Sequence, residues 1–496
     1  MNITEYFLNE DNRDAAREVF INAVDIGIDF KQQENVRIGD ISKLDPTTFL
    51  DDLPLEGQPI QDIQKEFTDR FLPYCYNFAS PNFMGFPDAG NSIAAIAGNI
   101  TSDFLQQNLI NQTFCSPVGT FAEISVIRWL REIVGYEISR DVDDIFDVGG
   151  VITGGGTTSN TIGMLLAREN HRPHTMKNGV GIDNDYYLVV PKGIGHYSVK
   201  SAQMWIGCGN RLLEVETDNF RYDLEALEKT LRQYKGRIMG LVAYAGDSRT
   251  MTVEKFDKVA ALVKSIDPNI WLHADACHGF SLGFSDKLKV KLSGIEQFDS
   301  ITTDPHKVMN SPYTISSLLV KDPQTLRTVS STSDLIMQEQ FAFGQITPFI
   351  GSKPWISLKL WFAIKNLGRK GFGEIIDQRH EMALFLAKLI SKSDDFILVN
   401  STIDINAVAF VFTAGNKDIS IEELNSLNRN IHSRVINEGK YHLHQFSISD
   451  AGIIKKGEII YPLRYMSGNP NLTTNHIQDM FNYIRTLGYE IKDSNL

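Results

Sequence analysis

The sequence predicts an α/β protein organised around one large, mostly parallel β-sheet. Two observations support this. Segments with strand character alternate with segments of helical periodicity from residue 186 to residue 320, a pattern typical of a parallel sheet with helices on both faces. A second, shorter alternation follows from residue 373 to residue 487. At 496 residues, the chain is also too long for one ordinary domain.

Three regions are expected. Residues 1–80 show helical periodicity and no obvious strand, residues 81–370 form a large domain, and residues 371–496 form a small α/β domain. The pair Gly368 and Gly371 is the expected hinge. In the large domain we expect strands at 186–190, 212–215, 238–244, 270–274, 300–303 and 315–320, and helices at 223–234 and 253–265. In the small domain we expect helices at 373–391, 421–438 and 474–487, and strands at 407–412 and 458–465.

Composition excludes several classes of function. A net charge of −13 argues against a nucleic-acid backbone as partner. The four cysteines show neither CxxC pairing nor metal-ligand spacing, so reduced thiols in a cytoplasm are expected, with no metal site. No run reaches the 18 apolar residues of a membrane span, and the first twelve residues lack the order of a signal peptide. We expect a cytoplasmic protein that does not contact membranes.

The segment 302–307, Thr-Thr-Asp-Pro-His-Lys, presents Lys307 just past an expected strand. Pro305 ends the strand because it has no N–H for the ladder. Buried-looking segments flank this one, and a lysine between apolar walls loses solvation, so we expect a neutral, nucleophilic amine near neutral pH. A Schiff-base lysine needs such an amine. The alternative is a boundary lysine whose ammonium reaches water.

Residues 149–160 contain five glycines followed by Thr157-Thr158-Ser159-Asn160, and a helix is expected at 162–169. A glycine-rich turn at a helix N-terminus offers N–H groups and a positive dipole end to an anion, and hydroxyls add further donors. The loop matches neither GxGxxG nor GxxxxGK[ST]. It is either a phosphate-binding loop or a tight turn.

Three further residues have two readings each. Asp275 ends a buried strand, where it either pairs with a cation such as a protonated pyridine nitrogen or caps a local turn. His196 lies on a flexible loop, either stacked on an aromatic ring or in a structural role. The loop 82–87, which contains Phe86, is either a pocket wall or a packing loop.

The combination of these features resembles the group II pyridoxal-5′-phosphate (PLP) decarboxylases, which include glutamate and aromatic-L-amino-acid decarboxylases. The resemblance runs from about Pro81 to Arg464. Its motifs, in order, are Ser116-Pro117 with Glu123, Gly155-Gly156-Thr157-Thr158-Ser159-Asn160, Gly195-His196, His273-Ala274-Asp275-Ala276, Asp304-Pro305-His306-Lys307, Leu358-Lys359-Leu360-Trp361, and Arg464 before Asn469-Pro470.

The resemblance implies PLP fold type I (aspartate aminotransferase-like) and a homodimer with active sites at the interface. Lys307 would hold PLP as a Schiff base, Asp275 would pair with the pyridinium nitrogen, and His196 would stack on the ring. The phosphate would be bound by Thr158 and Ser159 with help from Asp304 and His306. Arg464 would grip a substrate carboxylate or form an ion pair between domains, Phe86 would contact the substrate, and residues 109–115 would line the neighbour's site.

Some residues depart from the family pattern. Asp247-Ser248-Arg249 stands where relatives carry threonines, and Cys277 replaces an alanine under the ring, as a filler or as a nucleophile. No tyrosine occurs from residue 314 to residue 440, although a loop tyrosine in the family is thought to protonate the carbanion left by CO₂. The segment Phe341-Ala342-Phe343 falls about where it would lie, and a phenyl ring donates no proton. His278 or a water is an alternative donor.

The implied function is PLP-dependent decarboxylation of an L-amino acid to an amine and CO₂, a lyase activity of amino acid metabolism. One alternative keeps the cofactor and adds oxygen-dependent deamination to an aldehyde. The other is a catalytically silent PLP-binding protein, against which the retained Lys307 argues. The sequence does not name the amino acid.

Overall fold

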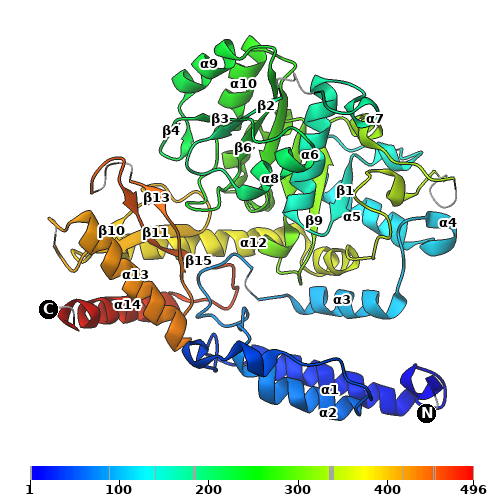
Figure 1. Ribbon diagram of the computed structural model, residues 1–496, viewed down its shortest axis with the longest axis horizontal. Helices are drawn as coiled ribbons and strands as arrows, with labels where there is room; N and C mark the ends of the chain where they lie inside the picture. The colour runs from blue at the N-terminus through cyan, green and yellow to red at the C-terminus, as the bar shows by residue number, and fades with distance from the viewer. Residues whose placement is uncertain are drawn as a thin grey trace.

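The computed structural model describes residues 3–88, 90–139, 141–181, 186–334, 340–416, 418–450, 452 and 454–494. Figure 1 shows a large α/β body, a smaller α/β body beside it that carries the C-terminus, and N-terminal helices beneath. The long helix α12 (Leu358–Ser391) runs between the two bodies (Figure 1). Each body has its own cluster of buried apolar side chains.

The large body contains a seven-stranded sheet in the order β1-β9-β8-β7-β6-β2-β3. Strand β9 is antiparallel to β1 and β8, and the other neighbouring pairs are parallel. The strands are β1 (Gly150–Thr153), β2 (Tyr187–Pro191), β3 (Leu212–Val215), β6 (Ile238–Tyr244), β7 (Trp271–Asp275), β8 (Ser300–Thr303) and β9 (Ser316–Val320). The mostly parallel sheet is therefore confirmed, and the six strands expected from residue 186 to residue 320 lie within one residue of these bounds.

The central strands of this sheet are buried along their full length because helices cover it. Helix α6 (Gly156–His171) packs on β6, β7, β8 and β9 and against α8 (Tyr197–Trp205). Helix α5 (Gly119–Ile133) packs on β1 and β9. Helices α9 (Leu224–Gln233) and α10 (Phe256–Ile266) contact each other and lie within one to three residues of the expected bounds.

The small body is built on the antiparallel sheet β10-β11-β15-β12 with α13 (Ile421–Glu438) and α14 (Thr474–Ser494). Its strands are β10 (Phe396–Leu398), β11 (Ala407–Phe412), β12 (His444–Gln445) and β15 (Leu463–Met466). Helix α12 is broken at Gly368, where φ is 63° and ψ is 178°, a conformation that favours glycine. The boundary expected at residue 370 thus lies inside α12, next to this break.

One expected strand of the small body is wrong. Residues 458–465 form two strands in different sheets, β14 (Ile459–Ile460), paired with β13 (Ile448–Ser449), and β15. Pro462 lies between them and cannot donate to a ladder, so the chain leaves one sheet and enters the other there.

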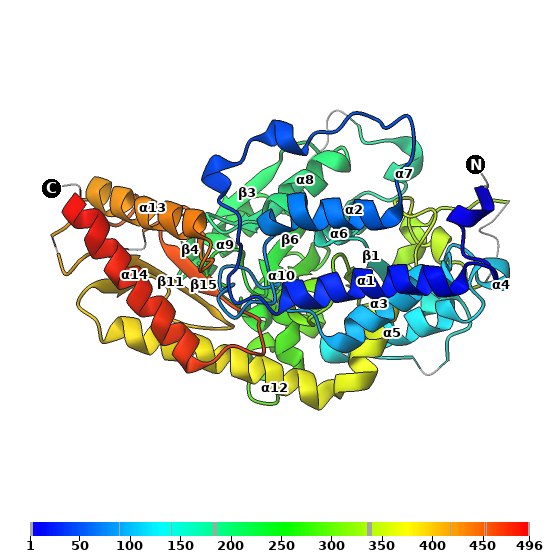
Figure 2. The same ribbon diagram turned by 90° about the horizontal axis from the view of Figure 1, so that it is seen from below.

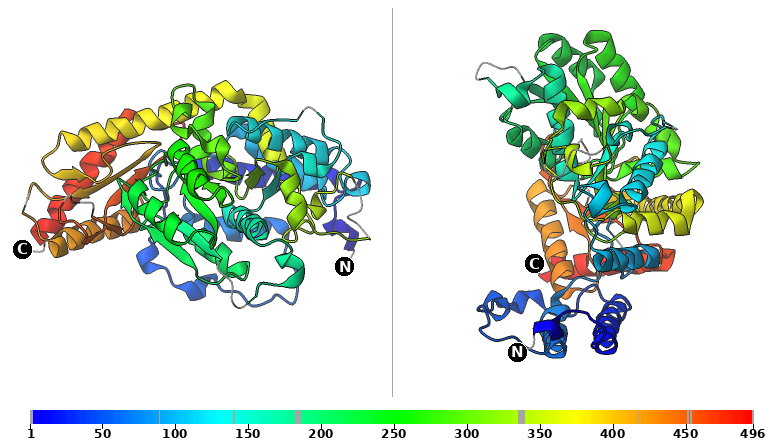
Figure 3. Two further views of the ribbon diagram at one scale, coloured as in Figure 1. Left: turned by 90° about the horizontal axis from the view of Figure 1, so that it is seen from above. Right: turned by 90° about the vertical axis from the view of Figure 1, so that its right-hand side faces the viewer.

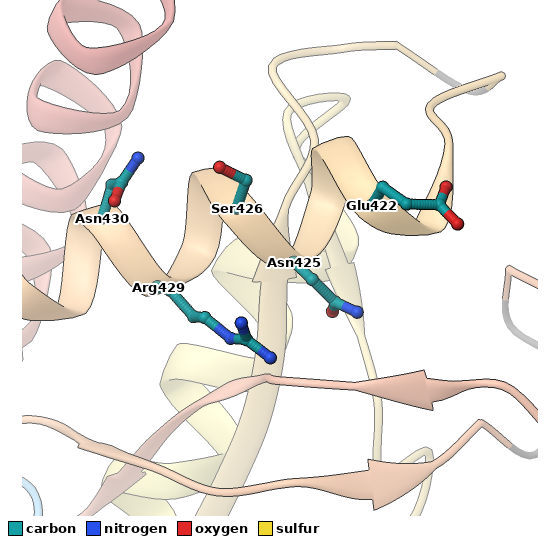
Figure 4. Close-up of a pocket in the computed structure, with 5 residues that line it drawn as sticks. All are labelled: Glu422, Asn425, Ser426, Arg429 and Asn430. Carbon is teal, nitrogen blue, oxygen red and sulfur yellow. The ribbon is translucent and has the colours of Figure 1, made fainter.

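Polar side chains of α13 contact the chain between β14 and β15. A shallow hollow on this helix is lined by polar side chains (Figure 4), namely Glu422, Asn425, Ser426, Arg429 and Asn430. Asn425 donates to the carbonyl of Ile459 at 2.8 Å and accepts from the N–H of Tyr461 at 3.2 Å. The Arg429 guanidinium lies 3.8 Å from the centre of the Tyr461 ring. These contacts give the polar face of α13 a structural role.

The N-terminal helices α1 (Arg13–Lys31) and α2 (Ile60–Glu66) lie side by side (Figure 2) and project below the large body (Figure 3, right). They are joined by Gln64, whose amide donates to the carbonyl of Val19 at 3.1 Å. Their apolar residues stay 42–47% exposed, namely Phe20, Ile21, Val24, Ile28, Ile60 and Ile63. Among the described residues, no helix has the length and apolarity that crossing a bilayer requires.

Candidate active site

A cavity of about 440 Å³ opens at the carboxyl ends of the large sheet's strands, where ligands bind in open α/β sheets. The segments that follow β1, β2, β6, β7 and β8 supply much of its wall, and the loop before α3 (Ile93–Leu105) and strand β15 complete it. Its lining includes Phe86, Asp88, Gly155, Gly156, Thr157, His196, Ser198, Gly246, Ser248, Asp275, Cys277, His278, Asp304, His306, Lys307, Tyr313 and Arg464.

Lys307 lies on α11 (Pro305–Val308), the single turn that follows β8. Its Nζ is 2.8 Å from Oδ2 of Asp304, and the other oxygen of that carboxylate accepts from the hydroxyl of Ser316 on β9. Burial lowers the pKa of Lys307, but the acidic groups beside it, Asp304 first among them, together outweigh burial and raise that pKa above its ordinary value. The expected neutral amine is therefore wrong for the chain alone, because the wall beside Lys307 carries a carboxylate.

His196 and Asp275 are joined through two intervening side chains. Nδ1 of His196 lies 2.6 Å from Oγ of Ser198, and the Asn160 amide donates to Ser198 at 2.8 Å and to Oδ2 of Asp275 at 3.0 Å. Burial lowers the pKa of His196. Sequence reasoning missed the roles of Asn160, which lies in a quoted motif, and of Ser198, two residues after His196. The sequence does not separate Asn160 from the neighbouring polar residues Thr158, Ser159 and Thr161, because only the fold shows which of them faces Asp275.

A second histidine fixes the orientation of Asn160. Oδ1 of Asn160 lies 3.1 Å from Nε2 of His273, whose Nδ1 lies 2.8 Å from Oγ of Ser300. Burial lowers the pKa of His273 to about 4, so the ring is neutral and Nε2 donates to the amide oxygen. The amide nitrogen of Asn160 is thereby directed at Asp275.

The glycine-rich loop brings the start of a sixteen-residue helix to the cavity. Helix α6 begins at Gly156, six residues before the expected helix. A Cβ on Gly156 would lie 2.9 Å from both Oδ1 of Asp304 and Sγ of Cys277, so only glycine fits this approach. Of the loop's described residues, Gly155, Gly156 and Thr157 line the cavity, whereas Thr158 and Ser159 do not. The Ser159 hydroxyl instead lies 2.8 Å from that of Thr153.

The other expected site residues all reach the cavity. His306 lines it and places Nδ1 2.7 Å from the carbonyl of Ile315. Phe86 lines it with 39% of its surface exposed. Arg464 donates to the carbonyls of Ser248 and Gly85. Within the described chain Arg464 has no carboxylate partner, so the proposed ion pair between domains is not formed, and burial lowers its pKa to about 10.

The departures from the family pattern have structural explanations. Asp247 is fully buried and accepts from the N–H groups of Arg249, Thr250 and Thr252, so it holds the turn after β6. Burial raises the pKa of Cys277 well above its ordinary value. A thiol that stays protonated is a weak nucleophile, which favours the filler role.

Of the segment 341–343, Phe343 does not reach the cavity of its own chain. Its side chain is fully buried in the large core, with Nζ of Lys353 5.5 Å from its ring centre. A role of residues 341–343 in a neighbouring subunit's site stays a prediction. His278 does line the cavity, but burial lowers its pKa to about 3, so near neutral pH it has no proton to donate as an imidazolium.

Among the residues that the structure describes, no three His, Cys, Asp or Glu side chains are placed to hold a metal ion together.

The Asp304–Lys307 contact can be tested without any ligand. Asp304→Asn should lower the pKa of Lys307 by about one unit or more, because the opposite charge is lost while burial remains. At a fixed pH below that pKa, the neutral fraction of the amine then rises about tenfold. Reductive methylation of the ligand-free protein from pH 7 to 10, with peptide mass spectrometry, measures this rate. Lys370, whose side chain is 93% exposed, is the internal reference. An unchanged profile at Lys307 would contradict the assignment.

Comparisons with known proteins support the same site. The family model described as the pyridoxal-dependent decarboxylase conserved domain matches residues 44–413. The chain is 26% identical over 462 residues to an L-2,4-diaminobutyrate decarboxylase of Acinetobacter baumannii, covering 88% of this chain and 86% of that protein. It is 24% identical over 428 residues to an aromatic-L-amino-acid decarboxylase of Bacillus atrophaeus, covering 84% and 82%.

The fold is shared with solved structures of the same kind. A crystal structure of Oryza sativa TDC with PLP and tryptamine superposes with a TM-score of 0.84 at 20% identity, covering 98% of this chain and all of that one. At this identity the likeness establishes the fold, PLP fold type I. The family model spans most of the chain, so the chain belongs to the pyridoxal-dependent decarboxylase family, the PLP-dependent lyases that decarboxylate amino acids.

Proposed function

We propose that the chain decarboxylates an L-amino acid to the corresponding amine and CO₂, with Lys307 as the lysine that binds PLP. The observation that carries this proposal is the position of Lys307. Its amine faces the cavity, is held by Asp304 at 2.8 Å, and lies beside a wall that also contains Asp275 and His196. A strand-end lysine in such a wall is the arrangement that covalent binding of an aldehyde cofactor requires.

The residues present fit PLP. Gly156 leaves room where a Cβ would meet Asp304 and Cys277, and the N-terminus of α6 suits a phosphate. Asp275, 5% exposed, is ready to pair with a pyridinium nitrogen, and His196 is a flat ring on the cavity wall. We assign the phosphate hydroxyl contact to Thr157 because it lines the cavity. The competing assignment is Thr158 and Ser159, with Asp304 and His306 in support.

PLP supplies a conjugated pyridinium ring that accepts the electron pair released when the bond from Cα to the carboxylate breaks. The chain's residues prepare for this. Asp275 holds a proton on the ring nitrogen, and Asn160, oriented by His273, keeps that carboxylate in place. In the chain alone Asp304 favours a protonated Lys307 amine, so this amine would have to lose a proton before it could bind an aldehyde cofactor.

Arg464 is proposed to orient the substrate carboxylate. Two of its nitrogens are occupied by backbone carbonyls, but Nε is buried without a partner in the described chain. A buried guanidinium with unused donor capacity attracts a carboxylate. Phe86 follows Gly85, whose carbonyl accepts from Arg464, and it lines the cavity. We propose that Phe86 contacts the rest of the substrate.

The chain is further proposed to be a cytoplasmic homodimer with active sites at the interface. Helices α1 and α2 carry six apolar side chains that are 42–47% exposed, and a contiguous apolar patch on a surface is typical of a protein–protein interface. Within residues 109–115, Leu109 to Asn111 are buried and Phe114 is 65% exposed, so Phe114 is the residue of this segment that we propose reaches a neighbouring site. Four cysteines without disulfides agree with a reducing compartment.

The reaction is tested by incubating the purified PLP-loaded enzyme with each of the common L-amino acids and with diamino acids. We expect CO₂ and an equal amount of amine from at least one of them, without oxygen uptake. Lys307→Ala should abolish turnover and the absorbance of lysine-bound PLP. Lys370→Ala, on an exposed face, should retain both. Aldehyde with oxygen consumption, or full activity of Lys307→Ala, would contradict the proposal.

The phosphate contact is tested by two neighbouring threonines. Thr157→Ala should raise the dissociation constant of PLP about tenfold or more, because a charge-assisted hydrogen bond is worth about 1.5–3 kcal/mol. Thr158→Ala should change it less than about threefold, since that side chain does not line the cavity. Fluorescence titration of the ligand-free enzyme measures both constants. A larger loss of PLP affinity in Thr158→Ala than in Thr157→Ala would instead assign the phosphate contact to Thr158.

The oligomeric state is tested by sedimentation velocity of the PLP-loaded enzyme. One chain has a mass of 55.8 kDa, and we expect a single species of twice that mass at micromolar concentration. Val24→Asp should weaken the dimer, because it buries a charge in the apolar face, whereas Asp25→Asn should not. A monomer that is fully active would contradict the shared active site.

A further inference from the structure

The loop before α3 places a third carboxylate in the cavity. Asp88 lines it together with Asp275 and Asp304. The other two are committed within the chain, Asp275 to Asn160 and Asp304 to Lys307. Asp88 differs from both. No lysine or arginine of the described chain forms an ion pair with it, and its Oδ1 is buried without a hydrogen bond.

The groups around Asp88 do not neutralise it. Tyr313, also on the cavity wall, hydrogen-bonds to the carboxyl of Asp88, and its ring lies 5.2 Å from that of His306. Arg379 acts on it from a distance, but the Arg379 donors go to the carbonyls of Gly468 and Val308 and to the Asn310 side chain.

Such a carboxylate is costly unless a cation joins it. Burial raises the pKa of Asp88, and His306, Tyr313 and Lys307 only partly offset this rise. A cationic ligand at Asp88 would restore the charged form and regain the lost solvation. A substrate with an acidic side chain would bring like charges together, and one with an apolar side chain would leave the carboxyl unpaired.

We propose that Asp88 selects amino acids whose side chain ends in an ammonium group, so that the substrates of this enzyme are diamino acids. The inference rests on the proposed decarboxylase function and adds the substrate class to it. Tyr313 is the positioning residue that holds the carboxyl. Arg464, whose Nε is buried without a partner among the described residues, then meets the substrate's carboxylate, so both charged ends of the substrate find a partner.

The test compares each diamino acid with the neutral isostere in which a methyl group replaces the ammonium. The pairs are 2,4-diaminobutyrate with norvaline, ornithine with norleucine, and lysine with 2-aminoheptanoate. For the PLP-loaded wild type, kcat/KM for CO₂ release should favour at least one diamino acid about tenfold to a hundredfold, the range of a hydrogen bond between charged groups. In Asp88→Asn that ratio should fall to within about threefold.

Two variants serve as controls. Asp218→Asn removes an exposed carboxylate on β4 (Thr217–Asp218) and should keep the wild-type ratio. Asp88→Ser replaces Asp88→Asn if the latter does not fold. Equal loss of kcat for every substrate with an unchanged ratio would assign Asp88 to proton transfer or to stability and overturn its role in selection.

A binding measurement separates this inference from the reaction itself. Calorimetry of the PLP-loaded enzyme with 1,3-diaminopropane and with butylamine, its neutral isostere, requires no decarboxylation. Wild type should bind the diamine about tenfold more tightly or better, and Asp88→Asn should lose that preference. If no amino acid releases CO₂, the proposed function fails while this preference still tests Asp88. If CO₂ is released and wild type prefers neutral or acidic substrates, the assignment of Asp88 alone is overturned.

Discussion

The ion pair between Lys307 and Asp304 is the contact around which the site is arranged. It joins the residue after β8 to the first helical turn beyond it, and the Ser316 hydroxyl ties the same carboxylate to β9. Gly156 approaches so closely that any side chain would meet Asp304. One carboxylate therefore fixes the lysine, the start of α6 and the antiparallel strand relative to one another. Burial lowers the pKa of the Lys307 amine and the neighbouring negative charge raises it, and the net result is a raised pKa.

The sheet order explains how distant residues reach one cavity. Strands β6, β7 and β8 are neighbours and β2 flanks β6. His196, Asp275 and Lys307 therefore leave the same edge of the sheet, although more than a hundred residues separate His196 from Lys307 along the chain. Asn160, on the first turns of α6, bridges Asp275 to Ser198 and so couples the two sides of the expected cofactor site. Asn160, Ser198 and His273 each have a hydrogen-bond partner, as buried polar groups normally do.

Much of this could be predicted from the sequence because strand periodicity and strand-end polar residues are local signals. Six strand positions and the cavity placement of His196, Asp275 and Lys307 followed from them. Features set by side-chain direction and by packing could not be predicted. The raised pKa of Lys307 depends on the direction of the Asp304 carboxylate, which lies only three residues away but is held by Ser316 on β9, and the burial of Phe343 depends on core packing. Pro462 was a local signal that the expected strand 458–465 divides into two, but the apolar residues around it suggested one continuous strand. Asp88 gave no signal at all, since only the fold brings it to the cavity.

The central claim is that Lys307 is the residue that binds PLP. Reduction of the PLP-loaded wild-type enzyme with borohydride, followed by digestion and tandem mass spectrometry, locates the covalent attachment directly. The account predicts one modified lysine per chain, Lys307, with addition of a substrate amino acid before reduction protecting it. Modification of another buried lysine, such as Lys359 or Lys353, with Lys307 unmodified, would contradict the account.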